Sequence, residues 1–142
     1  MPDTERKMAM SLRSPLVPVS WGELLDKITI LEIKAERIAD PARRANVEAE
    51  LRALLPARHG LGGEAADITG LVSQLKRVNE RLWDIEDAIR LAEKDQDFGP
   101  RFVRLARDVY HTNDQRAVLK RRINDRLGSD LVEEKSYAAM AA

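Results

Sequence analysis

The sequence predicts an all-α protein, a three- to four-helix bundle dominated by a long antiparallel helical hairpin at about residues 67–94 and 100–127. Three observations predict this fold. Apolar residues recur at helical spacing through most of the chain. Charged residues make up 34% of the chain and aromatic residues only 4%, which is typical of long helices with solvated faces. Only a short turn separates the last two helical segments, and short links make long helices antiparallel neighbours.

Length and composition indicate one domain in a reducing compartment. A chain of 142 residues buries enough apolar surface to fold alone, and without cysteine it has no disulfide and no thiolate metal site. We expect a disordered leader at residues 1–14, a single helical domain at 16–127 and a flexible tail at 128–142. The sequence contains no signal-peptide core and no run of ~20 apolar residues. It therefore predicts a soluble, cytoplasmic protein with no membrane partner.

The first predicted helix begins after Ser20 and ends near residue 40. Ser20 and Glu23 stand at the two positions of a capping box, in which each side chain bonds the backbone amide of the other residue. An apolar stripe follows at helical spacing, but Ile30 and Ile33 lie off it, so the helix is apolar on two sides. Because one hairpin covers only one of these sides, we expect a homodimer.

A second, shorter helix is predicted from about Pro41 to Leu55. Pro56 follows it, and the glycine-rich residues 59–63 then predict a flexible loop. These residues follow a helix and lack the lysine of a phosphate-binding loop, so we interpret them as a linker.

The hairpin has the most regular pattern in the chain. Its first helix carries apolar residues at three- and four-residue spacing, as in a coiled-coil seam: Ile68, Leu71, Leu75, Val78, Leu82, Ile85, Ile89 and Ala92. Residues 95–100 supply the turn, and Pro100 suits the first position of the last helix. That helix is predicted to end at about Leu127, before Gly128.

Charge is divided between the two helices of the hairpin. Residues 80–97 carry seven acidic and three basic side chains, whereas residues 101–127 carry eight basic and three acidic ones. One interpretation is a basic helix that binds RNA or phosphate. The other is that opposite charges pair across the hairpin and fix its register. We favour pairing, because single-stranded RNA readers usually offer stacking aromatic residues and the basic helix has only Phe102 and Tyr110.

Arg116 is the residue that fits the predicted fold least. It lies at the centre of the buried stripe of the last helix, and a guanidinium cannot lose its charge. If the position is enclosed, Arg116 needs a carboxylate or an anionic ligand. The candidate counter-charges are Glu32, on the apolar face of the first helix, and Glu86, beside the coiled-coil seam. Trp83 lies off that seam, which predicts a second packing face on its helix, shared with the first helix.

Two interpretations of these polar residues remain open. One is a polar layer that fixes the register of the helices. The other is a pocket for a small anionic ligand, because cations clustered in a buried stripe are costly unless an anion arrives. The candidate ligand-binding residues are Arg116, Lys120, Asn113, Asp114, Asn124, Glu32, Asn79, Trp83, Glu86 and Arg90.

The sequence offers no catalytic residue. His59 and His111 are isolated, so neither a metal site nor a cofactor is predicted, and the serines have structural explanations. This favours a non-enzymatic interaction or scaffold protein, with a second copy or another protein as partner. The first alternative is a binder of a small anionic ligand, with an all-helical isomerase-type enzyme as its extreme form. The second is RNA binding through the last helix, although nucleic acid is disfavoured.

Three stretches carry a resemblance to a known family: GELLDKITILEIKAERI at residues 22–38, LKRVNERLWDIEDAIR at 75–90 and FVRLARDVYHTNDQRAVLKRRIN at 102–124. Over about residues 16–127 the chain resembles a family of short, all-helical bacterial proteins known only as a domain of unknown function. The resemblance implies no activity, substrate or catalytic residue.

Overall fold

The structure is a computed structural model that describes residues 12–137. Within these residues the chain forms four α-helices and one 3-10 turn: α2 (Trp21–Arg37), α3 (Pro41–His59), η1 (Gly62–Glu64), α4 (Ala65–Lys94) and α5 (Pro100–Leu127). The predicted all-α fold is therefore confirmed. Most of the predicted leader, residues 1–11, lies outside the described residues.

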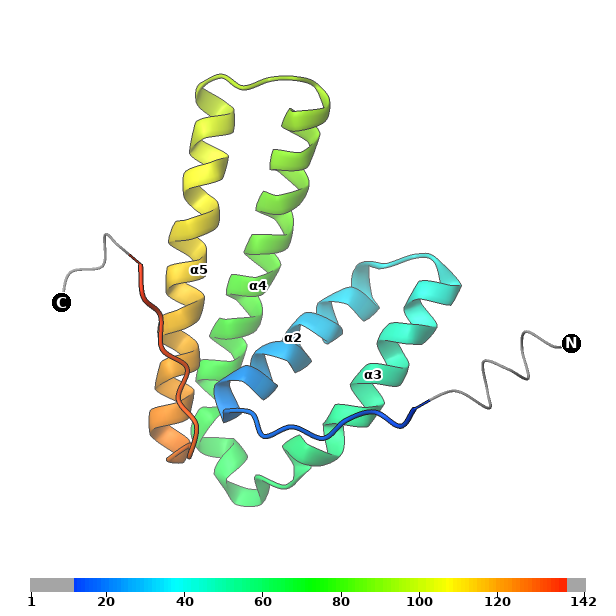
Figure 1. The fold of residues 1–142 in the computed structure, drawn as a ribbon, viewed down its shortest axis with the longest axis vertical. Helices are drawn as coiled ribbons and strands as arrows, with labels where there is room; N and C mark the ends of the chain where they lie inside the picture. The colour runs from blue at the N-terminus through cyan, green and yellow to red at the C-terminus, as the bar shows by residue number, and fades with distance from the viewer. Residues whose placement is uncertain (1–11, 138–142) are drawn as a thin grey trace, which may run out of the picture.

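Helices α4 and α5 form the predicted antiparallel hairpin (Figure 1). With 30 residues, α4 is about 45 Å long. Its seam positions Ile68, Leu75, Ile85 and Ala92 are buried. Gly128 ends α5 in the left-handed conformation, with φ of 60°, which a glycine adopts without steric cost. The hairpin boundaries lie within two residues of those predicted.

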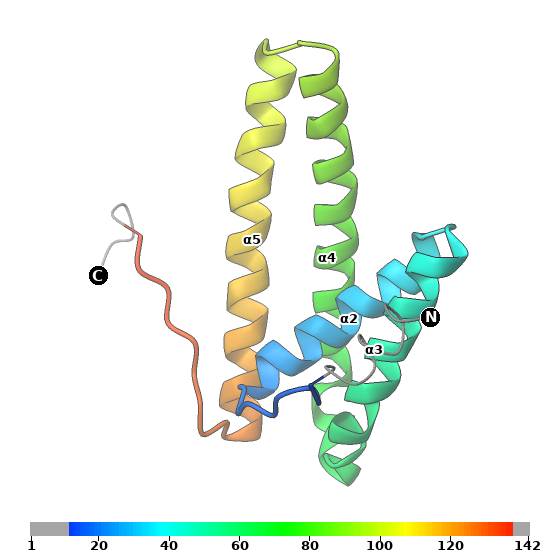
Figure 2. The ribbon, with the colours of Figure 1, turned by 45° about the vertical axis from the view of Figure 1, so that its right-hand side comes forward.

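Helix α2 lies between the hairpin and α3, and it crosses the lower half of the hairpin obliquely (Figures 1 and 2). Leu25 belongs to the core that α2 shares with α4 and α5. Lys27 pairs with Glu50 of α3, with 3.0 Å between Nζ and Oε1, and Leu24 and Leu31 share that side of α2 by helical spacing. Both apolar sides of α2 are therefore covered within one chain. The two apolar sides of α2 therefore do not by themselves require a second copy, because α3 covers one of them, and the homodimer stays a prediction.

The start of α2 confirms half of the predicted capping box. The Glu23 amide donates to the Ser20 hydroxyl, with 3.1 Å between N and Oγ. The Glu23 carboxylate does not return to Ser20 but accepts a hydrogen bond from Lys120. A tertiary contact to a cation replaces the local bond here, because the carboxylate is attracted more strongly by a full positive charge than by a backbone amide, which carries no net charge.

Helix α3 runs to His59, so the predicted end at Leu55 was wrong. Pro56 lies inside the last turn, where its missing amide leaves only the carbonyl of Arg52 without a helical donor. Both residues are exposed, so the unpaired carbonyl lies on the surface and costs little. The Pro56 carbonyl in turn accepts from the Gly60 amide at 3.2 Å, which closes the helix. A proline in an exposed last turn does not end a helix.

The upper half of the hairpin stands clear of the other helices. Arg37, the last residue of α2, reaches α4 at Asp84, with 2.6 Å between Nη1 and Oδ1. Beyond this point α4 and α5 continue with no third helix on them (Figures 1 and 2). Within residues 12–137 no ion pair joins α4 to α5, so the prediction that charge pairs across the hairpin fix its register was wrong. Apolar packing in the seam fixes it instead.

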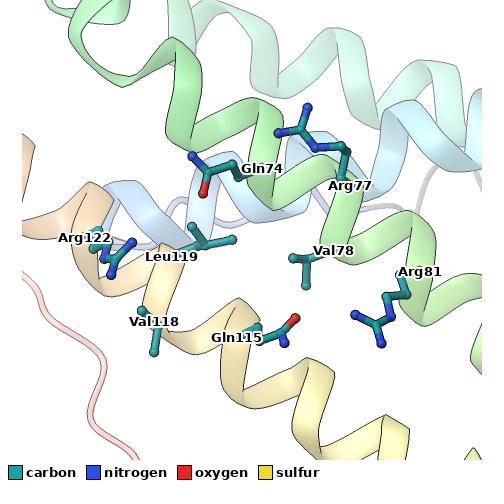
Figure 3. A pocket seen from close by; sticks show the side chains of 8 residues that line it. All are labelled: Gln74, Arg77, Val78, Arg81, Gln115, Val118, Leu119 and Arg122. Carbon is teal, nitrogen blue, oxygen red and sulfur yellow. The ribbon is translucent and has the colours of Figure 1, made fainter.

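The opposite side of the hairpin, turned away from α2, carries a groove between α4 and α5 (Figure 3). None of the helices in the described part of the chain is long and apolar enough to span a membrane.

Candidate functional site

The first turn of α2 touches the backbone of α5 at Gly22. The Gly22 amide donates to the side chain of Asn124, with 2.7 Å between N and Oδ1. A Cβ at position 22 would lie 2.5 Å from the carbonyl oxygen of Lys120, closer than atoms pack. Only glycine therefore allows the two helices to approach this closely.

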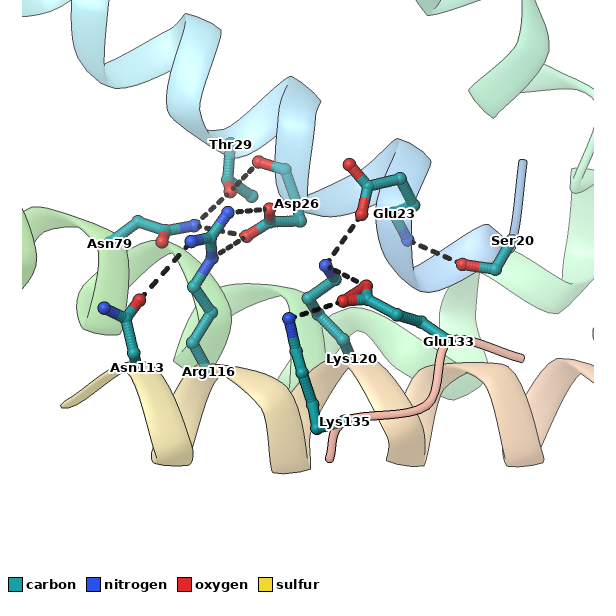
Figure 4. Close-up of polar contacts among 10 residues, drawn as sticks. All are labelled: Ser20, Glu23, Asp26, Thr29, Asn79, Asn113, Arg116, Lys120, Glu133 and Lys135. Carbon is teal, nitrogen blue, oxygen red and sulfur yellow. Dashed lines mark hydrogen bonds and ion pairs between the residues drawn. The ribbon is translucent and has the colours of Figure 1, made fainter. Parts of the chain in front are cut away.

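One turn further along α2, Asp26 forms a buried ion pair with Arg116 (Figure 4). The Asp26 residue is 1% exposed. Its carboxylate accepts two bonds from the guanidinium, one from Nε at 2.8 Å and one from Nη2. Two parallel bonds of this kind fix both the distance and the angle between their helices.

The same carboxylate is bound from α4 as well. The Asn79 amide donates to Asp26 at 2.9 Å and to the Thr29 hydroxyl at 3.0 Å. The Thr29 hydroxyl donates to the backbone carbonyl of Asp26 at 2.7 Å. No buried side-chain nitrogen or oxygen of the described residues lacks a partner. Asp26 thus joins three helices in one fully satisfied network, which makes its burial tolerable.

The pKa of Arg116 is raised above its ordinary value, mainly because the guanidinium donates hydrogen bonds to Asp26. Burial acts in the opposite direction and is outweighed. The guanidinium of Arg116 therefore stays charged and has no proton to exchange, unlike a general acid or base.

Lys120 is the second cation under α2, and it is 8% exposed. Its ammonium donates to Glu23 at 2.7 Å and to Glu133 at 2.9 Å. Burial lowers the pKa of Lys120, but the bonds to the two carboxylates outweigh it and the pKa is raised. Glu133 has a pKa lowered to about 2, because Lys135 and Lys120 both donate to it.

Glu133 belongs to residues 129–137, an extended segment after α5 that we call the strap. Ser129 begins it and accepts from the Trp21 amide, with 3.3 Å between N and Oγ. Glu134 pairs with Arg121 at 3.0 Å, one residue after the Lys120 contact. The strap is thus attached to α2 at one end and to α5 along its length. Through Glu133 the strap supplies Lys120 with a second carboxylate, in addition to that of Glu23 on α2.

The space around this cluster is small. A cavity of about 30 Å³ lies beneath the strap, lined by residues that include Lys120, Asn124 and Glu133. This volume suits one water molecule and is too small for an organic ligand. Because both cations also have protein carboxylates, the geometry favours the polar layer over the ligand pocket as the interpretation of the Arg116 cluster.

The structure brings together part of the predicted set. Arg116, Lys120, Asn79 and Asn124 meet under α2, and Asn113 lies next to Arg116, with 3.5 Å between Oδ1 and Nη1. The remaining members of the set form no hydrogen bond with the two cations: Glu32, Trp83, Glu86, Arg90 and Asp114.

The predicted counter-charges were wrong. Asp26, and not Glu32 or Glu86, neutralises Arg116. Glu86 pairs with Arg90 within α4 at 3.5 Å. The predicted second packing face of α4 extends only as far as Trp83. The guanidinium carbon of Arg37, the last residue of α2, lies 5.8 Å from the centroid of the Trp83 ring. Beyond that residue, α2 has ended.

The residues that the sequence reasoning missed are Gly22, Asp26, Thr29 and Glu133. A signal existed for the first three: they recur at positions 22, 26 and 29, helical spacing that places a small and polar stripe along one side of an otherwise apolar helix. Glu133 had no such signal, because an extended segment carries no periodicity.

These contacts define a small all-α protein whose long hairpin is joined to a third helix through a buried polar layer. Within residues 12–137 no three histidine, cysteine or acidic side chains gather as a metal site would require. The chain belongs to a family of unknown function, DUF6165, and the match covers residues 16–142. No curated protein and no solved structure matches it.

Proposed function

We propose that this protein is a helical interaction module that self-associates through the free half of its hairpin. One observation carries the proposal: the side of the hairpin that α2 covers continues beyond α2 with no helix on it (Figures 1 and 2). An apolar helix face that the chain itself leaves uncovered is typical of proteins that complete their packing in an assembly.

On α5 the uncovered side is apolar. Phe102, Ala106 and Val109 follow the helical spacing that leads on to Asn113 and Arg116 under α2. All three are only half-buried, although the ring of Phe98 packs edge-on against Phe102 with 5.3 Å between the ring centroids. The stripe is polar where α2 covers it and apolar where no helix covers it. A monomer would be expected to show the opposite arrangement, with apolar residues in the covered part and polar residues in the uncovered part.

On α4 the uncovered side begins beyond Trp83 and carries Glu86 and Arg90. Glu86 and Arg90 pair within the helix, and their side chains are 44% and 79% exposed. Together with Phe102, Ala106 and Val109 these residues form what we call the docking face.

The docking face is self-complementary, which favours a second copy as the occupant. If α4 packs antiparallel to α4 of a partner, Glu86 faces the partner's Arg90 and the reverse contact also forms, as a two-fold axis requires. Residues 88 and 106 both lie nine residues from residue 97 in the turn, so they stand at one level of the hairpin. The same axis therefore packs the apolar stripe of α5 against the same stripe of the second copy. It also places the two α2 helices at opposite ends of the dimer.

Charge reversal tests this proposal. Sedimentation of the wild-type protein is expected to show a dimer. Glu86→Arg and Arg90→Glu are each expected to sediment as monomers, because like charges then face one another. An equimolar mixture of the two variants is expected to regain the dimer, since each variant supplies the charge that the other lacks. A monomeric wild-type protein, or a mixture without recovery, contradicts the proposal.

An apolar-to-charged pair of variants provides a second test. Ala106→Glu on the docking face is expected to weaken self-association. Ala53→Glu on the exposed side of α3 is the matched control, because it makes the same chemical change in a helix far from the docking face. Circular dichroism checks that both variants keep their helices. Equal dimer dissociation in both variants would rule out the docking face as the interface.

A further inference from the structure

The groove between α4 and α5 has a volume of about 430 Å³ and lies on the side of the hairpin opposite the polar layer. Figure 3 shows side chains from both helices around a common space, with α2 behind them. The lining residues are Gln74, Arg77, Val78, Arg81, Gln115, Val118, Leu119 and Arg122.

The groove has an apolar floor and a cationic rim. Leu119 is 6% exposed and belongs to the core, whereas Val118 is 50% exposed and Val78 half-buried. Around them stand three arginines and two glutamines, and no carboxylate lines the groove. The arginines come from both helices, two from α4 and one from α5.

The three rim arginines differ from the cations under α2. None of Arg77, Arg81 and Arg122 forms an ion pair with any residue of the described chain, whereas Arg116 and Lys120 are both paired. Arg77 and Arg81 are four residues apart on one helix, a spacing at which like charges repel. An anion between the rim arginines relieves this repulsion.

We propose that this groove binds a small organic anion with an apolar body, carrying a phosphate or carboxylate group. The guanidinium groups bind such anions through paired hydrogen bonds, and the glutamine amides add further donors. The floor packs against the apolar body. The volume lies in the range of roughly 300–1,000 Å³ that small-molecule sites occupy.

Charge along the hairpin argues against an extended polyanion in the same groove. Toward the turn, residues 84–97 of α4 and the turn carry six acidic and two basic side chains, and residues 100–110 of α5 carry three basic and one acidic, so the two helices together are acidic there. An RNA strand that left the groove in this direction would meet carboxylates, whereas a small molecule stays among the arginines. The groove faces away from the docking face, so this proposal does not depend on self-association.

Calorimetric titration with three probes tests the site on the full-length protein. Naphthyl phosphate has both the anionic group and the apolar body, inorganic phosphate has only the first, and naphthol has only the second. We expect naphthyl phosphate to bind at least tenfold more tightly than either of the others. Arg77→Gln and Arg122→Gln are each expected to weaken its binding about tenfold, the loss of one charge-assisted hydrogen bond. Arg52→Gln on α3 is the matched control and is expected to leave binding unchanged.

Naphthyl carboxylate in the same titration distinguishes the two anionic groups, and binding of either supports the site. Three results overturn the proposal. The first is equal binding of naphthyl phosphate to wild type, Arg77→Gln and Arg122→Gln. The second is tight, arginine-dependent binding of a single-stranded oligonucleotide with none of the small probes. The third is loss of self-association in the two arginine variants with no probe binding in the wild type, which would assign the groove to a protein interface.

Discussion

The guanidinium of Arg116 donates two hydrogen bonds to the carboxylate of Asp26, although the two residues are 90 positions apart in the chain. Asp26 is buried near the start of α2, and Arg116 lies in the lower half of α5. Their contact sets which turn of α2 meets α5. The stability of the molecule should therefore depend on this pair more than on any of its surface charges.

Replacing Arg116 with leucine is expected to destabilise the protein by about 3–5 kcal/mol, because Asp26 would remain buried without its counter-charge. Urea unfolding measures the loss. Arg52→Leu, at an exposed position of α3, is the control and should change stability by no more than about 0.5 kcal/mol. The double variant Asp26→Leu/Arg116→Leu should be more stable than Arg116→Leu alone. A single variant as stable as wild type would show that the pair is not structural.

Gly22 and Gly70 make a matched pair of helical glycines with opposite expectations. Alanine at position 22 meets the Lys120 carbonyl, so α2 must shift, at a cost of about 1–3 kcal/mol. Alanine at position 70 has open space around its Cβ and is expected to stabilise α4 by up to about 1 kcal/mol. Thermal unfolding of both variants compares them directly. A destabilised Gly70→Ala would mean that α4 is not a regular helix there.

Removing the side chain of Asn124 leaves the buried Gly22 amide without an acceptor. Asn124→Ala is expected to cost about 1–3 kcal/mol. Asn113→Ala is the control, because Asn113 is exposed and its bond to Arg116 is long at 3.5 Å. Similar losses in the two variants would contradict the role assigned to Asn124.

The strap should detach at low pH. The pKa of Glu133 is about 2 in the folded protein against an ordinary value of 4.5, because Lys135 and Lys120 donate to its carboxylate. The folded state thus binds this proton less readily than the unfolded chain, so the carboxylate stabilises the fold fully above pH 4.5. Its contribution is lost as the pH falls from 4.5 toward 2.

Glu133→Gln measures that contribution. The difference in unfolding free energy between wild type and variant should be constant near neutral pH and should disappear in the acid range. Glu134→Gln serves as the control, because Glu134 pairs with an exposed arginine and its side chain is 75% exposed. A difference for Glu133→Gln that persists unchanged to pH 2 would show that Lys120 does not hold the strap.

The helices could be predicted because their signals are local. Ser20 caps α2, Pro100 begins α5 and Gly128 ends it, and each acts through the residues beside it in the chain. Pro56 misled the prediction for the same reason. Its effect depends on whether the carbonyl that it leaves unpaired is exposed, and that is a property of the folded molecule.

Of the two partners in the ion pair, the sequence allowed Arg116 to be predicted but not Asp26. The helical projection of α5 shows that Arg116 needs a counter-charge, but it does not show where α2 crosses α5. Asp26 and Glu32 are both carboxylates on α2, and the crossing point decides between them. The close contact of Gly22 with the α5 backbone marks that point. The spacing of Gly22, Asp26 and Thr29 shows which face of α2 is involved, but not which turn of α5 it meets.

The partial cover that α2 gives the hairpin has a consequence for how the molecule opens. Amides around Leu75, where three helices meet, are expected to exchange hydrogen only when the whole fold is lost. Those between residues 85 and 110 are expected to exchange through a smaller, separate opening of two helices. Deuterium uptake by residues 85–110 should therefore fall when a second copy occupies the docking face. Hydrogen exchange reports that occupancy residue by residue, without any label on the protein.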